Sequence, residues 1–138
     1  MNKDKLKALY IQYGLTKEDV FKHQHYVIIT RSGIEKIQSQ ADINVEFESK
    51  VLERDFAVIK ATAYIDAKKL IQTFGSALKG DFKNGNCNTW YVAEMAEKRA
   101  LSRAVLKVTG FYELGVFGED ESDDFKRPRV EPKQLINK

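Results

Sequence analysis

The sequence has little cysteine and histidine, and this scarcity limits the chemistry that it supports. Cys87 is the only cysteine, so a disulfide within the chain is excluded. The two histidines, His23 and His25, form an H-x-H pair, but a closed zinc site would need further carboxylate ligands from distant positions. A glycine-rich phosphate-binding loop is missing as well. We therefore predict no metal site, no cofactor, no catalytic residue and no nucleotide hydrolysis.

Long hydrophobic runs are also absent. No segment is apolar over the roughly 20 residues that a membrane-spanning helix requires. The opening "MNKDKLKALY" lacks the apolar region of a secretory signal peptide. Together with the single cysteine, these features predict a protein of the reducing cytoplasm. The length of 138 residues suits one compact domain.

Charge is distributed unevenly along the chain. The net charge is +3, but the stretch "GEDESDD" (118–124) contains five acids and no base, which leaves +8 for the remaining residues. A basic body suits an anionic partner such as nucleic acid. A solvated surface with a solubilising tail explains the same charges.

The N-terminal part of the sequence shows mainly helical signals. Apolar residues recur at helical spacing over 4–13, and Thr16 with Asp19 resembles a capping box, so we expect two helices, the second ending near residue 23. The stretch "YVIIT" (26–30) predicts a short buried strand. A second capping box in "SGIE" (32–35) opens a further helix.

The periodicity then changes from helical to alternating. Alternation over 44–52, 56–65 and 70–80 predicts three strands joined by tight turns. A long helix follows from about residue 88 to Thr109, with Gly110 as its C-cap. The predicted fold is α+β, with short N-terminal helices (1–25), a three-stranded antiparallel meander covered by the long helix (26–117), and a disordered acidic tail (118–138).

The long helix and the sheet both carry a stripe of small residues. Alanine recurs every three or four positions from Ala93 to Ala104. Because protein interiors tolerate few voids, small residues on both surfaces predict a close approach of helix and sheet. The matching residues on the second and third strands are Ala57, Ala61, Ala63, Gly75 and Ala77.

This packing predicts that the basic residues of the long helix face solvent. Arg99, Arg103 and Lys107 recur every four positions and therefore share one side, with Lys98 beside them. The same order of acids before bases is also ordinary helix design, since it complements the helix dipole.

The loop before the helix adds further cations and aromatic rings. Lys79 and Lys83 are interleaved there with Phe82, Trp90 and Tyr91. Cations that track phosphates and rings that stack on bases are the components of a single-strand-binding surface, although a tryptophan at the start of a helix is more often a core anchor. The predicted nucleic-acid-binding residues are Lys60, Lys79, Phe82, Lys83, Tyr91, Lys98, Arg99, Arg103 and Lys107.

The order of these elements and the motif "EKRALSRAVLKVTGF" (97–111) resemble the single-strand annealing proteins of homologous recombination. These are the phage Red-beta and RecT proteins and their eukaryotic counterparts. The stretches "RSGIEKI" (31–37) and "FGSALKG" (74–80) occupy comparable places, so the resemblance spans about residues 26–111. It implies a protein without enzymatic activity that binds single-stranded DNA and promotes annealing in recombination, repair or replication. It also implies a homo-oligomeric ring or filament and, for a bacteriophage protein, the cytoplasm of the bacterial host.

The resemblance also implies roles for individual residues. Lys98, Arg99 and Arg103 would contact phosphates in a groove that leaves the bases facing outward. Arg99 is the closest match, whereas Ser102 stands where the family often has its basic residue. The acidic tail would compete with DNA for this groove or recruit partners.

Two other classes of function remain open. Glu48-Ser49-Lys50, with Asp42 upstream, forms an acid-x-lysine pattern that would suit a Mg²⁺-dependent nuclease. Strand alternation explains Glu48 and Lys50 equally well as solvent-facing residues. A structural or partner-binding protein would instead use the basic helix to dock another protein.

Overall fold

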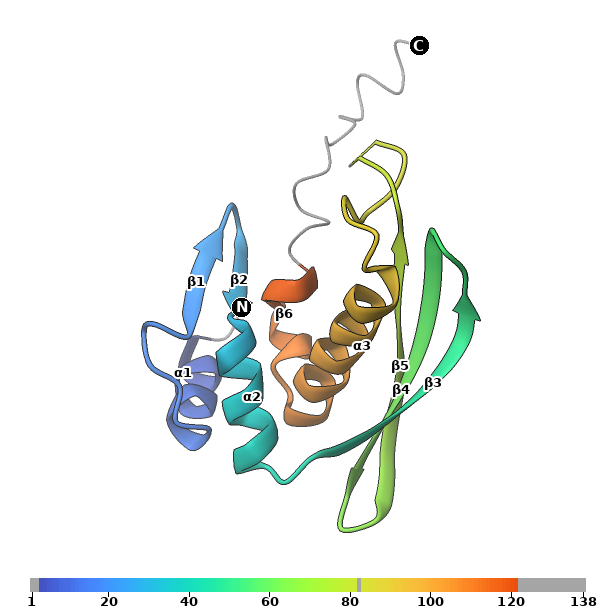
Figure 1. Ribbon diagram of the computed structural model, residues 1–138. Helices are drawn as coiled ribbons and strands as arrows, with labels where there is room; N and C mark the ends of the chain where they lie inside the picture. Colours follow the sequence, from blue (N-terminus) through green and yellow to red (C-terminus); the bar gives the residue numbers. More distant parts are fainter. Residues whose placement is uncertain (1–2, 82, 122–138) are drawn as a thin grey trace, which may run out of the picture.

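The computed structural model describes residues 3–81 and 83–121. This part of the chain is α+β, as predicted, but it contains two three-stranded sheets rather than one (Figure 1). The elements follow the order α1 (Lys3–Gln12), β1 (Val20–His23), β2 (Tyr26–Ile29), α2 (Arg31–Gln40), β3 (Asn44–Leu52), β4 (Phe56–Ile65), β5 (Lys68–Leu78), α3 (Val92–Thr109), the 3₁₀ turn η1 (Tyr112–Leu114) and β6 (Val116–Gly118).

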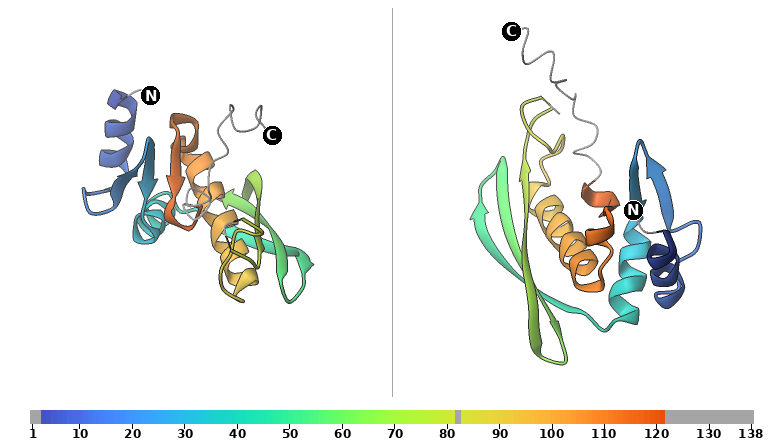
Figure 2. Two further views of the ribbon diagram at one scale, coloured as in Figure 1. Left: turned by 90° about the horizontal axis from the view of Figure 1, so that it is seen from above. Right: turned by 180° about the vertical axis from the view of Figure 1, so that it is seen from behind.

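The larger sheet is the predicted meander. Its strand order is β3-β4-β5, and both pairs are antiparallel. The third strand begins at Lys68 rather than residue 70, because Asp66 and Ala67 alone form the turn, both with positive φ. Helix α3 lies across one face of this sheet and packs mainly on β4 and β5 (Figures 1 and 2).

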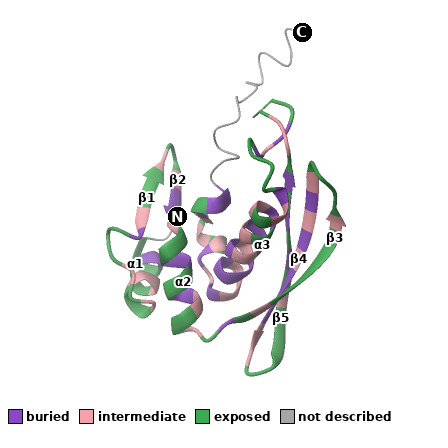
Figure 3. Cartoon of the chain, in the orientation of Figure 1, coloured by how far each residue is buried: buried purple, intermediate pink, exposed green. Residues whose placement is uncertain are grey.

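Small residues bring α3 and the sheet together, as the sequence predicts. Ala61 and Ala77 on the sheet and Ala100 on the helix are fully buried. Buried residues occur along much of α3 (Figure 3), because β6 and α2 also contact this helix. Helix and sheet approach closely at Gly75, where a Cβ atom would lie 2.1 Å from the carbonyl oxygen of Ala96. The absence of a side chain at Gly75 therefore sets how near the helix lies to β5.

The N-terminal segment differs from the prediction, since the expected second helix is strand β1, which pairs antiparallel with β2. The local capping pattern does form, because Thr16 N donates to Asp19 Oδ2 at 2.9 Å. Asp19 is also held by distant groups, accepting from Lys36 Nζ at 2.8 Å and, at its carbonyl, from Thr30 N at 2.8 Å. These tertiary contacts tie the turn to α2, and the chain continues as a strand.

The two remaining helices begin at other residues than expected. Helix α2 has Thr30 rather than Ser32 as its N-cap, since Thr30 Oγ1 accepts from Gly33 N at 3.1 Å. Helix α3 begins at Val92, a turn later than predicted, and ends at Gly110, which adopts the left-handed conformation of a C-cap as expected.

The chain after α3 contains structure that the sequence analysis missed. Strand β6 pairs parallel with β2 and completes a sheet of order β1-β2-β6. The acidic segment that follows was expected to be disordered, but Asp120 and Glu121 are buried, each 5% exposed. The rest of the predicted tail, 122–138, lies outside the described residues. The expected boundary after residue 25 falls in the turn of the β1–β2 hairpin.

Candidate nucleic-acid interface

Arg99, the closest match to the annealing-protein motif, is a structural residue in this fold. Its side chain is buried, and the residue is only 2% exposed. The guanidinium donates to three backbone carbonyls, those of Ser76 at 2.8 Å, Asn86 at 2.6 Å and Asp120 at 3.1 Å. The prediction that Arg99 faces solvent is therefore wrong, because the long side chain reaches past the edge of β5 and joins three segments of the chain.

The other basic residues of α3 do not form a continuous exposed row either. Arg103 donates to a backbone carbonyl of β5 at 2.8 Å and lies 3.4 Å from a carboxylate oxygen of Glu121. The ammonium group of Lys107 lies 5.1 Å from the ring centroid of Tyr112. Lys98 is partly exposed. The helix thus directs much of its positive charge at neighbouring parts of its own chain.

Lys60, on the second face of the sheet, is paired with an acid. Its ammonium group lies 3.6 Å from Glu48, which also forms an ion pair with Lys50. The hydrogen bond and charge of Lys50, together with the charge of Lys60, lower the pKa of Glu48. The carboxylate that the nuclease alternative requires is therefore engaged by two lysines. Within residues 3–81 and 83–121, no three histidine, cysteine or acidic side chains group as a metal site would require.

The loops at one end of the larger sheet gather cations and exposed aromatic rings. Trp90 is 56% exposed, so the core-anchor interpretation of this residue is wrong. The guanidinium of Arg54, in the β3–β4 turn, lies 4.9 Å from the Trp90 ring centroid, and the ammonium of Lys79 lies 4.8 Å from it. Tyr91 follows directly and is 68% exposed. We term Arg54, Lys79, Trp90 and Tyr91 the aromatic tip.

Backbone hydrogen bonds bring the two loops of the aromatic tip together. Lys79 N donates to the carbonyl of Asp55 at 2.7 Å, which ties the end of β5 to the β3–β4 turn. Arg99 holds the following loop through the carbonyl of Asn86, and Asn86 Oδ1 accepts from Leu78 N at 2.8 Å. The buried arginine of α3 thus positions the loop that carries Trp90.

A turn within the loop after β5 is closed by the backbone N–H of Gly85, which donates to the carbonyl of Asp81 at 2.8 Å. Asp81 accepts from the backbone N–H groups of Lys83 and Asn84 at 3.0 and 3.1 Å, and these hydrogen bonds lower the pKa of its carboxyl. A Cβ atom at Gly85 would lie 2.4 Å from the carbonyl oxygen of Leu78, so this position requires glycine. Lys83 is exposed on this turn, whereas the predicted site residue Phe82 lies outside the described residues.

Net charge does not distinguish the aromatic tip from the rest of the surface. Glu53 and Asp55 lie in the same turn as Arg54, and Asp81 lies near Lys83 in the chain. The distinguishing feature is the exposure of two adjacent large rings, one of them in contact with two cations. Isolated exposed apolar residues are common, but an exposed tryptophan next to a tyrosine is a candidate contact surface.

The sequence predicts two of the four residues of this surface, Lys79 and Tyr91, as binding residues. It favours Trp90 as a core anchor and does not indicate Arg54. The position of Arg54 could nevertheless have been predicted. In a three-stranded antiparallel meander, the turn between the first two strands lies at the same end of the sheet as the C-terminal end of the third strand. The turn "ERD" (53–55) therefore had to lie beside the loop that follows β5.

Comparison with known proteins assigns the chain to no family. No protein-family model, no curated protein and no solved structure matches it. The part of the chain that the structure describes also contains no helix long and apolar enough to cross a bilayer. Any function proposed here depends on the geometry of the aromatic tip and on the resemblance of the α3 motif.

Proposed function

We propose that this chain binds single-stranded DNA through the aromatic tip and promotes the annealing of complementary strands. The observation that carries the proposal is the environment of Trp90, whose ring is more than half exposed and lies within 5 Å of two cations. Aromatic rings that stack on bases, next to cations that pair with phosphates, are the common components of single-strand-binding surfaces.

Each part of the aromatic tip has a distinct role in this proposal. Trp90 holds the charged ends of Arg54 and Lys79 near its ring through cation–π contacts, so both are available to phosphates. Tyr91, the more exposed ring, stacks on a base. Stacking depends on the faces of the bases rather than their edges, so binding has little sequence preference.

A single aromatic tip covers only a few nucleotides. Useful affinity therefore requires several copies along one strand, which is consistent with the homo-oligomer that the resemblance implies. Annealing itself also comes from the resemblance of "EKRALSRAVLKVTGF" (97–111) to the annealing proteins. Arg99 contributes indirectly in this proposal, by fixing the loop before α3.

The proposal is tested by fluorescence anisotropy with a labelled oligothymidylate. We expect Tyr91→Ala to weaken binding about tenfold, since stacking on one base is worth about 1–3 kcal/mol. Trp90→Ala should weaken binding to a similar extent, because Arg54 and Lys79 lose the ring that holds them. Phe74→Ala is the matched control, because Phe74 is 48% exposed on β5, away from the aromatic tip. Wild-type affinity in both tip variants would contradict the assignment.

Annealing is tested separately, with two complementary strands that carry a fluorophore and a quencher. We expect the wild-type chain to accelerate pairing and Trp90→Ala to lose most of this acceleration. If the chain binds single strands but does not accelerate their pairing, it coats single-stranded DNA and does not promote annealing. A chain that binds no oligonucleotide at low salt would favour the partner-binding alternative.

A further inference from the structure

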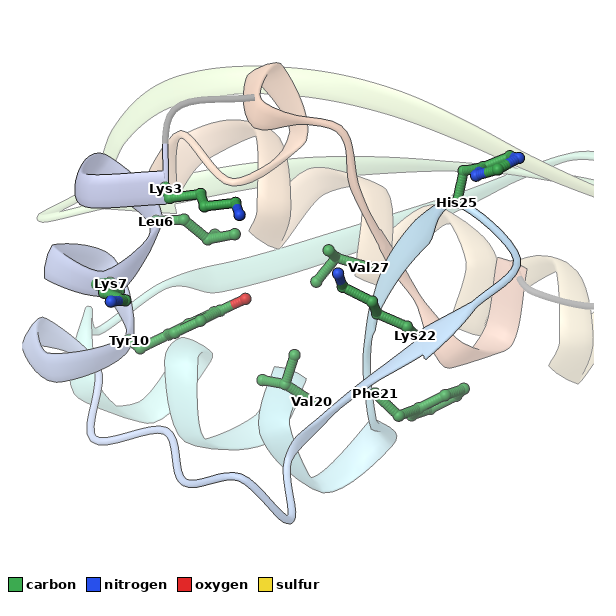
Figure 4. Close-up of a pocket in the computed structure, with 9 residues that line it drawn as sticks. All are labelled: Lys3, Leu6, Lys7, Tyr10, Val20, Phe21, Lys22, His25 and Val27. Atoms are coloured by element: carbon green, nitrogen blue, oxygen red, sulfur yellow. The ribbon is translucent and has the colours of Figure 1, made fainter.

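A second candidate site lies away from the larger sheet, between α1 and the β1–β2 hairpin. A cavity of 450 Å³ opens there, within the range of roughly 300–1,000 Å³ typical of ligand pockets. Its floor consists of the apolar side chains of Leu6, Val20 and Val27 (Figure 4). The hydroxyl group of Tyr10 points into the same space (Figure 4).

Three lysines surround this apolar floor. Lys3 and Lys7 share one face of α1 with Leu6 and Tyr10, because these positions are three or four residues apart. On the opposite wall, Lys22 pairs in register with Val27 and therefore lies on the same side of the hairpin. The ammonium groups of Lys3 and Lys22 both point into the space between α1 and β1 (Figure 4).

The charge of these lysines is not balanced locally. None of the described residues that line the cavity is acidic. Within the described part of the chain Lys3, Lys7 and Lys22 form no ion pair, whereas Lys36, Lys50 and Lys60 all contact carboxylates. An apolar floor with an uncompensated cationic rim is complementary to a ligand that has an apolar part and several negative charges.

The lining favours a peptide over other anions. A nucleobase has donors as well as acceptors at its edges, whereas the lining side chains that can accept a hydrogen bond are those of Tyr10 and His25. A fatty acid has a single carboxylate, which would leave two of the three lysines without a partner. Within the described residues β1 pairs only with β2, so its outer edge is open to hydrogen bonds from an extended backbone.

We propose that this cavity binds an acidic segment of a partner protein. An aliphatic or aromatic side chain of the segment lies on the floor formed by Leu6, Val20 and Val27, and its carboxylates pair with Lys3, Lys7 and Lys22. This site is separate from the aromatic tip, so the chain carries a docking site for a protein in addition to its proposed surface for DNA.

The test uses the full chain and a labelled peptide of sequence Asp-Asp-Glu-Asp-Leu-Phe, followed by fluorescence anisotropy. We expect the peptide to bind the wild-type chain and both Lys7→Glu and Lys22→Glu to weaken binding at least tenfold. Because Lys7 and Lys22 are exposed, we expect both variants to fold as the wild-type chain does. Circular dichroism checks this. Lys68→Glu, at the exposed start of β5, is the matched charge reversal and should bind as wild type does.

Further arms separate this proposal from its alternatives. A peptide with two serines in place of Leu-Phe should bind at least tenfold more weakly, and equal binding would contradict the apolar floor. Displacement of the peptide by a single-stranded oligonucleotide or by oleate would overturn the proposal in favour of that ligand. Lys22→Glu should leave oligonucleotide binding unchanged, and Trp90→Ala should leave peptide binding unchanged. The proposals for the cavity and for the aromatic tip can therefore be contradicted independently.

Discussion

The carbonyl oxygen of Ala96 lies 2.1 Å from the point where a side chain on Gly75 would begin, and the amide nitrogen of Ala100 lies 2.5 Å from it. Both atoms belong to the backbone of α3, which cannot move aside as the end of a flexible side chain can. The contact between helix and sheet therefore depends on glycine at this position.

Gly75→Ala is expected to lower the free energy of unfolding by about 1–3 kcal/mol, the usual cost of overpacking. The added methyl group would push α3 away from β5 along the buried interface. Urea denaturation measures the loss. Ser76→Ala, whose side chain is exposed, is the neighbouring control and should change stability by less than about 0.5 kcal/mol. Equal stability of the two variants would mean that α3 does not lie this close to the strand.

Arg99→Met is expected to lower the free energy of unfolding by at least about 2 kcal/mol, because several carbonyls would lose their donor. Methionine keeps most of the apolar stem but provides no N–H group. Arg99→Lys should restore little, since an ammonium group lacks the planar fork that reaches separate acceptors. Thermal unfolding measures both variants, with Arg103→Met as the more exposed comparison. If Arg99→Met were fully stable yet failed to bind DNA, a phosphate-contacting role would be indicated instead.

The salt dependence of oligonucleotide binding distinguishes the contribution of the cations of the aromatic tip from that of its aromatic rings. For single strands, the slope of log K against log salt is about −0.7 for each phosphate that is neutralised. Lys79→Ala and Arg54→Ala should each reduce the magnitude of this slope by about 0.7, whereas Tyr91→Ala should weaken binding without changing it. Oligonucleotide titrations at several salt concentrations give the slopes. A wild-type slope near zero would exclude phosphate contacts altogether.

Asp19 makes the stability of the N-terminal region dependent on pH. Its buried carboxylate accepts hydrogen bonds from Lys36 and from the backbone of Thr16, which lower its pKa below the ordinary value of 3.8. The charged form is thus favoured in the folded state. Its stabilising contribution is complete above the ordinary pKa and is lost as the pH falls through the lowered value.

Asp19→Asn should therefore destabilise the chain by about 1–3 kcal/mol near neutral pH, the cost of losing a hydrogen bond to a charged group. The difference from wild type should shrink as the pH falls below 3.8 to about 3, because the unfolded wild-type chain then takes up a proton more readily than the folded chain. Urea midpoints at the two pH values measure this. A difference that stays constant with pH would show that the charge of Asp19 has no part in the effect.

The parts of the fold that could be predicted are those with a local signal. Alternation of polar and apolar residues located β3, β4 and β5, and the spacing of small residues placed α3 on the face that contains Gly75. Strand β1 could not be predicted in this way. The Thr16–Asp19 capping pattern is real, but hydrogen bonds from Lys36 and Thr30 decide the path of the chain. Strand β6 is three residues long and pairs with a strand far earlier in the sequence.

The candidate site, like the fold, could be predicted only where the sequence carries a local signal. Helical spacing correctly places Arg99 and Arg103 on one side of α3, but spacing does not reveal how far a guanidinium reaches around the helix. In Arg99 it reaches the carbonyls of Ser76 and Asn86, so the residue becomes part of the core. The sequence around Arg54 does not indicate a binding residue. Its position beside Trp90 follows only from the sheet topology, which places the β3–β4 turn next to the loop after β5.

The pairing of Val27 with Val116 also has a consequence for how the chain folds as it is synthesised. The β1–β2 hairpin is made early, and an isolated hairpin of this size is only marginally stable in water. The smaller sheet is completed only after α3 has been synthesised, since β6 follows it. A nascent chain released before Val116 would keep the residues of the meander and of α3. It would, however, present β2 with an open, hydrophobic edge, the kind of strand through which chains aggregate.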